Sequence, residues 1–257
     1  MIAEKQAPIG WIRFNNPERR NAVSMEMWQA LEEIVRDYAQ DEAIRVIVVT
    51  GAGDKAFVSG ADISEFEQKR STPETTALYN QAAGRATDQL TQLGKPTIAM
   101  IRGFCIGGGV SVALSCDLRI AADSAKFGVP AAKLGLGYEA KGVRKLIDVV
   151  GPSFAKEIFF TARQFSAAEA LAMGLINRML PAAELETYVR EYAASIAANA
   201  PLTVASIKTI VAELVKDESA RDMALCRALV ERCFASEDYV EGRTAFMAKR
   251  KPVFKGR

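Results

Sequence analysis

The sequence contains no histidine, and this absence excludes more chemistry than any other feature of the composition. Histidine is the most frequent general base in enzymes and the most frequent metal ligand, and it is the second member of Ser-His-Asp and Cys-His arrangements. Histidine-dependent hydrolysis and histidine metal sites are therefore excluded.

Cysteine is scarce as well. The four cysteines, Cys105, Cys116, Cys226 and Cys233, form no C-x-x-C pair, and without histidine partners they do not predict a zinc site. We expect no metal and interpret these residues as buried, apolar free thiols of a protein from a reducing compartment.

The chain also lacks an excess of charge of one sign and a long hydrophobic run. Lys and Arg number 33 against 31 Asp and Glu, so no global field attracts nucleic acid or an anionic membrane. The first residues lack the apolar core of a signal peptide, and no apolar run approaches the ~18 residues that a membrane span requires. We therefore expect a cytoplasmic protein without nucleic-acid or membrane partners, in which any anionic ligand is bound locally.

The remaining composition is that of a globular protein, with 49% hydrophobic residues in 257. Short β-branched or apolar runs predict strands over 9–14, 44–50 and 97–101, and the second of these resembles a strand buried on both faces. After the possible helix cap Ser24, apolar residues recur at helical spacing and predict one apolar helix face: Trp28, Leu31, Val35 and Tyr38.

Strands alternate with helices to about residue 180, which indicates an α/β fold, whereas the residues from about 182 onward predict only helices. We expect an α/β core over 1–200 and a helical C-terminal region over 201–257. A mostly apolar stripe on one late helix is open to two interpretations, packing onto the core or a subunit interface: Leu225, Leu229, Arg232 and Cys233.

Two predicted strands run into glycine-rich loops, 51–62 and 103–111. The first loop contains a G-x-G-x-x-A string after a strand, which is a variant of the dinucleotide fingerprint. A Rossmann unit needs a helix that begins inside this string, but Phe57-Val58-Ser59-Gly60 interrupts it. We therefore reject nicotinamide binding.

Both loops lead into predicted helix starts. Ala61 precedes Asp62, a good N-cap residue, and Gly107-Gly108-Gly109 lead into a helix predicted over 110–114. Unpaired amides from two such loops form an oxyanion hole where they converge. The alternative is that the three glycines only allow close packing of a helix on a strand.

Several motifs, in order over nearly the whole chain, resemble the crotonase (enoyl-CoA hydratase/isomerase) superfamily. The motifs that carry the resemblance are Asn21-Ala22-Val23, Ala56-Phe57-Val58-Ser59-Gly60-Ala61-Asp62-Ile63, Lys95-Pro96-Thr97-Ile98-Ala99, Gly107-Gly108-Gly109, Cys116-Asp117-Leu118-Arg119-Ile120-Ala121, Ala125-Lys126-Phe127-Gly128 and Ala245-Phe246-Met247-Ala248-Lys249-Arg250-Lys251.

The resemblance implies a spiral of ββα units followed by helices that form a trimer or a dimer of trimers. It implies that the backbone amides of Ala61 and Gly108 hold the thioester carbonyl of an acyl-CoA, where they stabilise the enolate oxygen. Coenzyme A is then part of the substrate, and no separate cofactor is expected.

The same resemblance implies which residues line the thioester and the coenzyme A: Ala22, Lys55, Ala56, Ser59, Gly60, Asp62, Gly107, Ser111 and Ala131. Lys249 or Arg250 is expected to reach the coenzyme A phosphates. The alternative for this pair is ordinary solvated surface charge.

The sequence departs from the family pattern at two positions. The resemblance implies that an ordinary enoyl-CoA hydratase carries one glutamate two residues after the three glycines and another immediately after the F-G-x-P string, where this sequence has Ser111 and Ala131. Hydration needs two carboxylates to activate one water and deliver its proton. Efficient hydration by that route is therefore not expected.

Glu139 offers a replacement carboxylate, because related isomerases and dehalogenases have a catalytic carboxylate at the similar place. Beside an apolar acyl pocket its pKa would rise, which suits a proton shuttle. The alternative is a solvated acid at the start of a helix over 140–150. Tyr138 competes for the catalytic role, as in a related decarboxylase, or forms a wall of the acyl pocket. Ser111 is interpreted as a small residue that makes room and not as a nucleophile.

These observations favour an acyl-CoA enzyme that stabilises a thioester enolate, with double-bond isomerisation of an enoyl-CoA as the preferred reaction. Hydration and decarboxylation stay open within the same superfamily. An acyl-CoA-binding protein without turnover is the alternative from another class. An RNA-associated role gains no support, because the sequence has no basic block.

Overall fold

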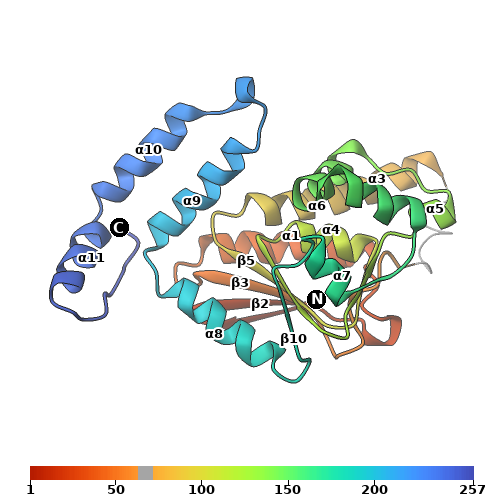
Figure 1. The fold of residues 1–257 in the computed structure, drawn as a ribbon, viewed down its shortest axis with the longest axis horizontal. Coiled ribbons are helices and arrows are strands. Elements are labelled where there is room, and N and C mark those ends of the chain that lie inside the picture. The colour runs from red at the N-terminus through yellow and green to blue at the C-terminus, as the bar shows by residue number, and fades with distance from the viewer. Residues whose placement is uncertain (63–71) are drawn as a thin grey trace.

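The computed structural model describes residues 1–62 and 72–257, and it contains two β-sheets with helices on their faces and a helical C-terminal arm (Figure 1). The strands of the six-stranded sheet lie in the order β1 (Ile2–Gln6), β2 (Ile9–Phe14), β3 (Val46–Gly51), β5 (Thr97–Ile101), β7 (Leu118–Ala122) and β10 (Arg178–Leu180). The four-stranded sheet has the order β4 (Ala56–Val58), β6 (Phe104–Ile106), β8 (Lys126–Gly128) and β9 (Phe165–Ser166). All neighbours are parallel except the pairs β1–β2 and β8–β9.

The helices of the body are α1 (Met25–Gln40), α3 (Pro73–Gln92), α4 (Gly108–Leu114), α5 (Ala131–Leu134), α6 (Ala140–Thr161), α7 (Ala167–Ala172) and α8 (Leu185–Ala197), with the short 3-10 helix η1 (Pro17–Arg19). The arm consists of α9 (Pro201–Leu214), η3 (Glu218–Ala220), α10 (Met223–Phe234) and α11 (Glu237–Met247). We use "arm" for residues 201–257 throughout.

The chain repeats one pattern three times, in which two strands are followed by a helix. The first strands of the three pairs, β3, β5 and β7, are neighbours in the large sheet, and the second strands, β4, β6 and β8, are neighbours in the small sheet. The α/β fold with ββα units is therefore present as expected from the sequence. The trimer-forming role of the C-terminal helices stays a proposal.

Two clusters of buried side chains hold the large sheet between layers. One face carries Trp11, Val46, Val48 and Ile98, which pack against α8. The alternate residues of the same strands, together with α1 and α3, form the larger cluster on the opposite face. Because successive strand side chains point to opposite faces, a strand covered on both sides must be apolar throughout, as β3 is.

The arm projects from the body in Figure 1, where α9 and α10 lie side by side and α11 lies beyond them. Its apolar side chains are largely uncovered, and Phe246 is 83% exposed. The predicted stripe on α10 does not pack onto the core, since Leu225 is exposed and Leu229 is half-buried. Of the two interpretations of that stripe, core packing is therefore wrong.

Most predicted elements are confirmed, with shifts at their ends. The strands 9–14 and 97–101 have the predicted bounds, while β3 begins two residues later than predicted and α4 begins two residues earlier. Ser24 caps α1 through a hydrogen bond from the Met27 amide to its Oγ, 3.3 Å long. The helix predicted to begin at Asp62 falls on 63–71 and lies outside the described residues.

Within residues 1–62 and 72–257, no single helix is long and apolar enough to cross a membrane. The pair α8 and α9 meets the criterion only when taken together, and it is bent by 101°.

Candidate active site

Three short parallel strands bring the predicted site loops together. β4, β6 and β8 are neighbours in the small sheet, and the loops at their carboxyl ends lead to Ala61 and to Gly108 and Ala131, the first residues of α4 and α5. Because parallel strands end at the same edge of a sheet, these loops meet there, as ligand sites of parallel sheets commonly do. A hydrogen bond of 2.8 Å from the Gly107 amide to the Gly128 carbonyl joins two of the loops.

The first loop presents the Ala61 amide through an isolated parallel bridge with Val23. Val23 donates to the Gly60 carbonyl at 2.8 Å and accepts from the Asp62 amide at 3.0 Å. In a parallel bridge the groups on both sides of the central residue are paired, so the N–H of Ala61 itself points away from Val23. The Tyr79 hydroxyl donates to the Val23 carbonyl at 3.0 Å and helps to hold this bridge.

The second loop presents the amides at the start of α4. Gly107 is the N-cap residue and has no side chain to cap the helix. The first bond of the helix runs from the Ser111 amide to the Gly107 carbonyl at 3.2 Å. The amides of Gly108, Gly109 and Val110 therefore have no partner inside the helix.

The Ala61 and Gly108 amides lie next to each other. A Cβ atom added to Gly108 would lie 3.9 Å from the Ala61 nitrogen and 3.8 Å from the Gly60 carbonyl carbon. Between residues that the structure describes, neither amide donates a backbone hydrogen bond. The two donors expected to form an oxyanion hole are thus brought together, and both are available.

The three consecutive glycines differ in what their backbone conformation and surroundings require. Gly107 has a φ of 54°, which L side chains rarely adopt. A Cβ on Gly109 would lie 2.2 Å from the Val58 carbonyl oxygen, so this residue is a glycine because of packing. Gly108 has neither constraint, since its added Cβ would make only ordinary contacts. Close helix–strand packing therefore explains Gly109 but not Gly108.

Asn21 holds together the two segments expected to meet coenzyme A. Its fully buried side-chain amide donates to the Ala52 carbonyl at 2.9 Å and to the Ala56 carbonyl at 2.7 Å. Ala22 and Ala56 are buried, while Lys55 is exposed.

Ser59 and Asp62 form contacts with the segment around Arg19. The Ser59 hydroxyl donates to the Arg19 carbonyl at 3.3 Å, and the Arg19 guanidinium donates to both carboxylate oxygens of Asp62 at 3.0 Å. Asp62 is only 7% exposed. This ion pair connects η1 to the residue after Ala61 and restrains the first loop.

The two positions at which the sequence departs from the expected hydratase pattern lie near the starts of two helices. Ser111 is half-buried in the first turn of α4, and Ala131 is buried at the start of α5. Neither side chain can activate water. The α6 helix packs against both α4 and α5.

Glu139 is the N-cap residue of α6, but its carboxylate forms no capping hydrogen bond. The helix therefore does not use the side chain as a structural cap. Glu139 is also exposed, so the apolar surroundings expected for it are absent. That part of the prediction is wrong for the chain alone, because the loop 135–139 lies at the surface. Tyr138 is 37% exposed and packs edge-to-face against Phe159, with ring centroids 4.9 Å apart.

The structure does not bring Lys249 together with the other predicted residues. Lys249 is exposed and follows α11, which lies at the opposite end of the molecule from α5 (Figure 1). Arg250 donates from both terminal nitrogens to the Glu241 carboxylate at 2.7 and 2.8 Å. Within this chain, Arg250 holds the C-terminal tail.

The four cysteines are free thiols that differ in burial. Cys105, Cys116 and Cys226 are buried free thiols as expected, and burial raises the pKa of Cys116 to about 12. Cys233 departs from the expectation, because it is only half-buried. No group of three potential ligands able to hold a metal ion occurs in the described part of the chain.

One neighbour of the site was missed from the sequence. The Cζ2 atom of Trp28 lies 3.8 Å from the position of an added Gly108 Cβ, and its indole nitrogen is buried without a hydrogen-bond partner among the described residues. Helical spacing assigns Trp28 to the apolar face of α1, but it gives no signal of what that face touches.

Comparison with known proteins agrees with this geometry. Residues 4–257 match the family model described as enoyl-CoA hydratase/isomerase. The chain is 33% identical to the short-chain-enoyl-CoA hydratase of Clostridium acetobutylicum, over 98% of this chain and 95% of that protein. It is 35% identical to the crotonyl-CoA hydratase of Syntrophomonas wolfei, over 99% and 97% of the two chains.

The fold agrees as well. A crystal structure of an enoyl-CoA hydratase/carnitine racemase from Magnetospirillum magneticum superposes with a TM-score of 0.95 at 36% identity, covering 99% of this chain and 95% of that one. These matches extend over nearly the full length of each protein. The chain therefore belongs to the enoyl-CoA hydratase/isomerase family, within the crotonase superfamily.

Proposed function

We propose that the Ala61 and Gly108 amides form an oxyanion hole for the thioester oxygen of an acyl-CoA substrate. The observation that carries this proposal is the adjacency of two unpaired amides, with the Gly108 Cβ position 3.9 Å from the Ala61 nitrogen. Preorganised donors of this kind stabilise the negative charge that develops on the oxygen when a proton leaves carbon 2.

The reaction that we propose is movement of a double bond, with Glu139 as the base. Its carboxylate removes a proton from carbon 2 of a 3-enoyl thioester, and the electron pair moves onto the thioester oxygen between the two amides. The same carboxyl returns the proton to carbon 4, so the double bond moves to the 2-position and no water is consumed. Support comes from the free carboxylate of Glu139 at the start of α6, which packs against α4.

Because Glu139 is exposed in the chain alone, we propose that the bound acyl chain shields its carboxylate from water. An acyl group seated against the first turn of α6 would exclude water from this carboxylate, which makes it a stronger base toward carbon. Tyr138, immediately beside it, is the alternative acting residue and would favour decarboxylation.

Hydration is the second candidate, and the names of the similar proteins favour it. The relatives from Clostridium acetobutylicum and Syntrophomonas wolfei are both named as hydratases. Ser111 and Ala131 oppose it, because the position expected to bind the attacking water has no carboxylate on either side. A water held elsewhere in the site would have to be activated by Glu139 alone.

The coenzyme A moiety is proposed to lie along the segments that Asn21 holds together, with the amine of Lys55 available to a phosphate. Lys249 is too far along the arm to serve the site of its own chain. We propose that it serves the site of a second copy in a trimer or a dimer of trimers, where the exposed apolar side chains of the arm would also be covered.

The test uses matched 2-enoyl and 3-enoyl thioesters with the unmodified enzyme. We expect conversion of the 3-enoyl substrate and exchange of its carbon 2 protons in deuterium oxide, with little water added to the 2-enoyl substrate. Glu139→Gln should abolish exchange and leave thioester affinity unchanged, and Tyr138→Phe is the matched control. Rapid water addition to the 2-enoyl substrate would show that hydration, the second candidate, is the reaction. Proton exchange that survives Glu139→Gln would show that Glu139 is not the base.

A further inference from the structure

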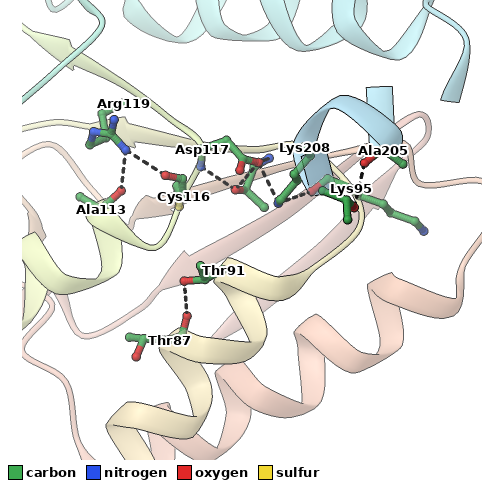
Figure 2. Close-up of polar contacts among 11 residues, drawn as sticks. Thr87, Thr91, Lys95, Ala113, Cys116, Asp117, Arg119, Ala205 and Lys208 are labelled. Carbon is green, nitrogen blue, oxygen red and sulfur yellow. Dashed lines mark hydrogen bonds and ion pairs between the residues drawn. The ribbon is translucent and has the colours of Figure 1, made fainter. Parts of the chain in front are cut away.

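The helix that presents the Gly108 amide is too short to hold its own position. α4 has 7 residues, and isolated helices of fewer than about 12 are marginal in water. The direction of its first amides therefore depends on contacts with the surrounding structure, which at the N-terminal end are the Gly107–Gly128 hydrogen bond and the packing of Gly109 on Val58. Its C-terminal end is where the structure concentrates polar contacts (Figure 2).

Arg119 provides one anchor. Its buried guanidinium donates to the carbonyl of Cys116 at 2.9 Å, to that of Ala113 at 3.5 Å and to that of Leu175 at 2.8 Å. A cation at this end also interacts favourably with the helix dipole. Arg119 thus connects the last turn of α4 to the segment after α7.

Asp117 provides a second anchor, to the start of β5. Its carboxylate accepts from the Thr97 amide at 2.7 Å and from the Thr97 hydroxyl at 2.9 Å, and its own amide donates to the same hydroxyl at 2.9 Å. These reciprocal bonds fix the chain directly after α4. Charge-assisted bonds to a carboxylate are stronger and shorter than neutral ones.

A third anchor reaches the same carboxylate from the arm. The amine of Lys208, on α9, donates to Asp117 Oδ2 and to the Lys95 carbonyl, both at 2.9 Å (Figure 2). The Lys208 side chain is only 15% exposed. The separation of 91 residues between Lys208 and Asp117 makes this a tertiary connection.

Side-chain hydrogen bonds between arm and body are otherwise few. Among the described residues, the only other one runs from the Arg45 guanidinium to the carbonyl of Phe254 in the tail, at 2.7 Å. A cavity of about 800 Å³ separates much of the arm base from the body and has Lys95 and Phe254 in its wall. Of the residues that the structure describes, none in the arm belongs to either cluster of buried apolar side chains in the body. Lys208 is therefore a main point at which the arm contacts the body.

We propose that Lys208 is a positioning residue of the active site, which holds Asp117 and with it the helix that presents the Gly108 amide. The arm then contributes to the oxyanion hole through its body contact, without touching substrate. The inference rests on the proposed role of Gly108. It predicts that breaking the Lys208–Asp117 contact weakens polarisation of the thioester while leaving coenzyme A affinity intact, because the segments around Asn21 are held separately.

A chromophoric thioester measures that polarisation directly. In 4-dimethylaminocinnamoyl-CoA the amine is conjugated to the thioester carbonyl, so stronger hydrogen bonds to the carbonyl oxygen move its absorption to longer wavelength. We expect Lys208→Met to lose at least half of the red shift of the bound probe and to lower kcat by about tenfold, since small displacements of catalytic groups have effects of this size or larger. KM and the affinity for the probe should stay unchanged.

Four further variants make the test specific. Lys208→Arg keeps the cation and its donors and should retain the shift. Arg45→Met removes the other arm–body bond and is the matched control, which should also retain it. Asp117→Asn should reproduce the loss, and the double variant with Lys208→Met should be no worse than either single variant, because both act through one contact.

The outcomes separate this inference from the proposed function. If Gly108→Pro leaves the red shift unchanged, the oxyanion hole itself is wrong. If Gly108→Pro removes the shift but Lys208→Met and Asp117→Asn retain it, only the positioning role fails. If Lys208→Met and Arg45→Met lose the red shift equally, the effect comes from arm docking and the role of the specific contact is wrong. The role is also wrong if the red shift is lost only when light scattering shows dissociation, because the effect then comes from assembly. Should Lys208→Met not fold, the result with Asp117→Asn decides.

Discussion

Replacement of Gly108 by proline tests the oxyanion hole with little disturbance of the fold. Gly108 is the first residue of α4, where the amide has no partner inside the helix. Proline is favoured at this helix position, and its missing N–H therefore costs the helix no hydrogen bond. An added Cβ makes contacts of 3.8 Å or longer with Gly60, Trp28 and Ala61, so space is available at that atom.

The expected effects on stability and on turnover differ widely. We expect the free energy of unfolding to change by no more than about 1 kcal/mol, the usual size of a compatible proline substitution. Loss of one oxyanion donor is expected to lower kcat by about 10²–10³-fold, which corresponds to about 2.7–4 kcal/mol of transition-state stabilisation.

The assay compares thermal unfolding, binding of the chromophoric thioester and exchange of the carbon 2 protons in three proteins. The unmodified enzyme and Gly108→Ala both keep the amide, whereas Gly108→Pro lacks it. Gly108→Ala should therefore lose much less activity than Gly108→Pro. A folded Gly108→Pro variant with normal turnover, or equal losses in both variants, would refute the assignment of this amide.

Four other changes have directions that follow from the structure. Glu139→Gln should abolish proton exchange and keep thioester affinity, as measured by exchange and by titration with the chromophoric thioester. Ser111→Glu combined with Ala131→Glu should raise water addition to a 2-enoyl thioester, and no gain in product analysis would contradict the water-site interpretation. Hydrogen bonds from the Arg250 guanidinium lower the pKa of Glu241 from 4.5 to about 2, so the stabilisation is present above pH 4.5 and is lost as the pH falls toward 2. The difference in Tm between the unmodified protein and Glu241→Gln should therefore shrink over that range, and a constant difference would contradict it. Truncation after Ala200 removes the exposed apolar helices and should give monomeric or aggregated protein by light scattering, whereas a stable, active trimer would contradict the role of the arm in assembly.

The strands that could be predicted from the sequence are those whose apolar composition reflects burial on both faces of the sheet. β3 is fully buried, so its β-branched run is visible in the sequence. β1 was missed because it is an edge strand with an exposed, charged side, and Glu4 and Lys5 hide its pattern. β4, β6 and β8 have 3 residues each, too few for a period to appear.

The candidate site was predictable where it depends on local backbone. Glycines after a strand and before a helix identify free amides, and the resemblance to a family then assigns Ala61 and Gly108 to one oxygen. The surroundings of Glu139 depend on a surface loop and on what binds there, so they were predicted incorrectly. The contact of Lys208 with Asp117 joins positions 91 residues apart, and no pattern along the chain indicates which lysine finds which carboxylate.

The three consecutive glycines have a consequence for how this protein tolerates mutation. A library of variants selected only for folding should retain Gly109, where any side chain meets the Val58 carbonyl. It should also retain Gly107, whose φ of 54° and ψ of −110° lie outside the left-handed helical region that asparagine tolerates. The same selection should leave Gly108 free to vary, because its Cβ position is open. Only selection for turnover would preserve it. Sequencing the survivors of the two selections would then separate the glycines required for folding, Gly107 and Gly109, from the glycine required only for turnover, Gly108.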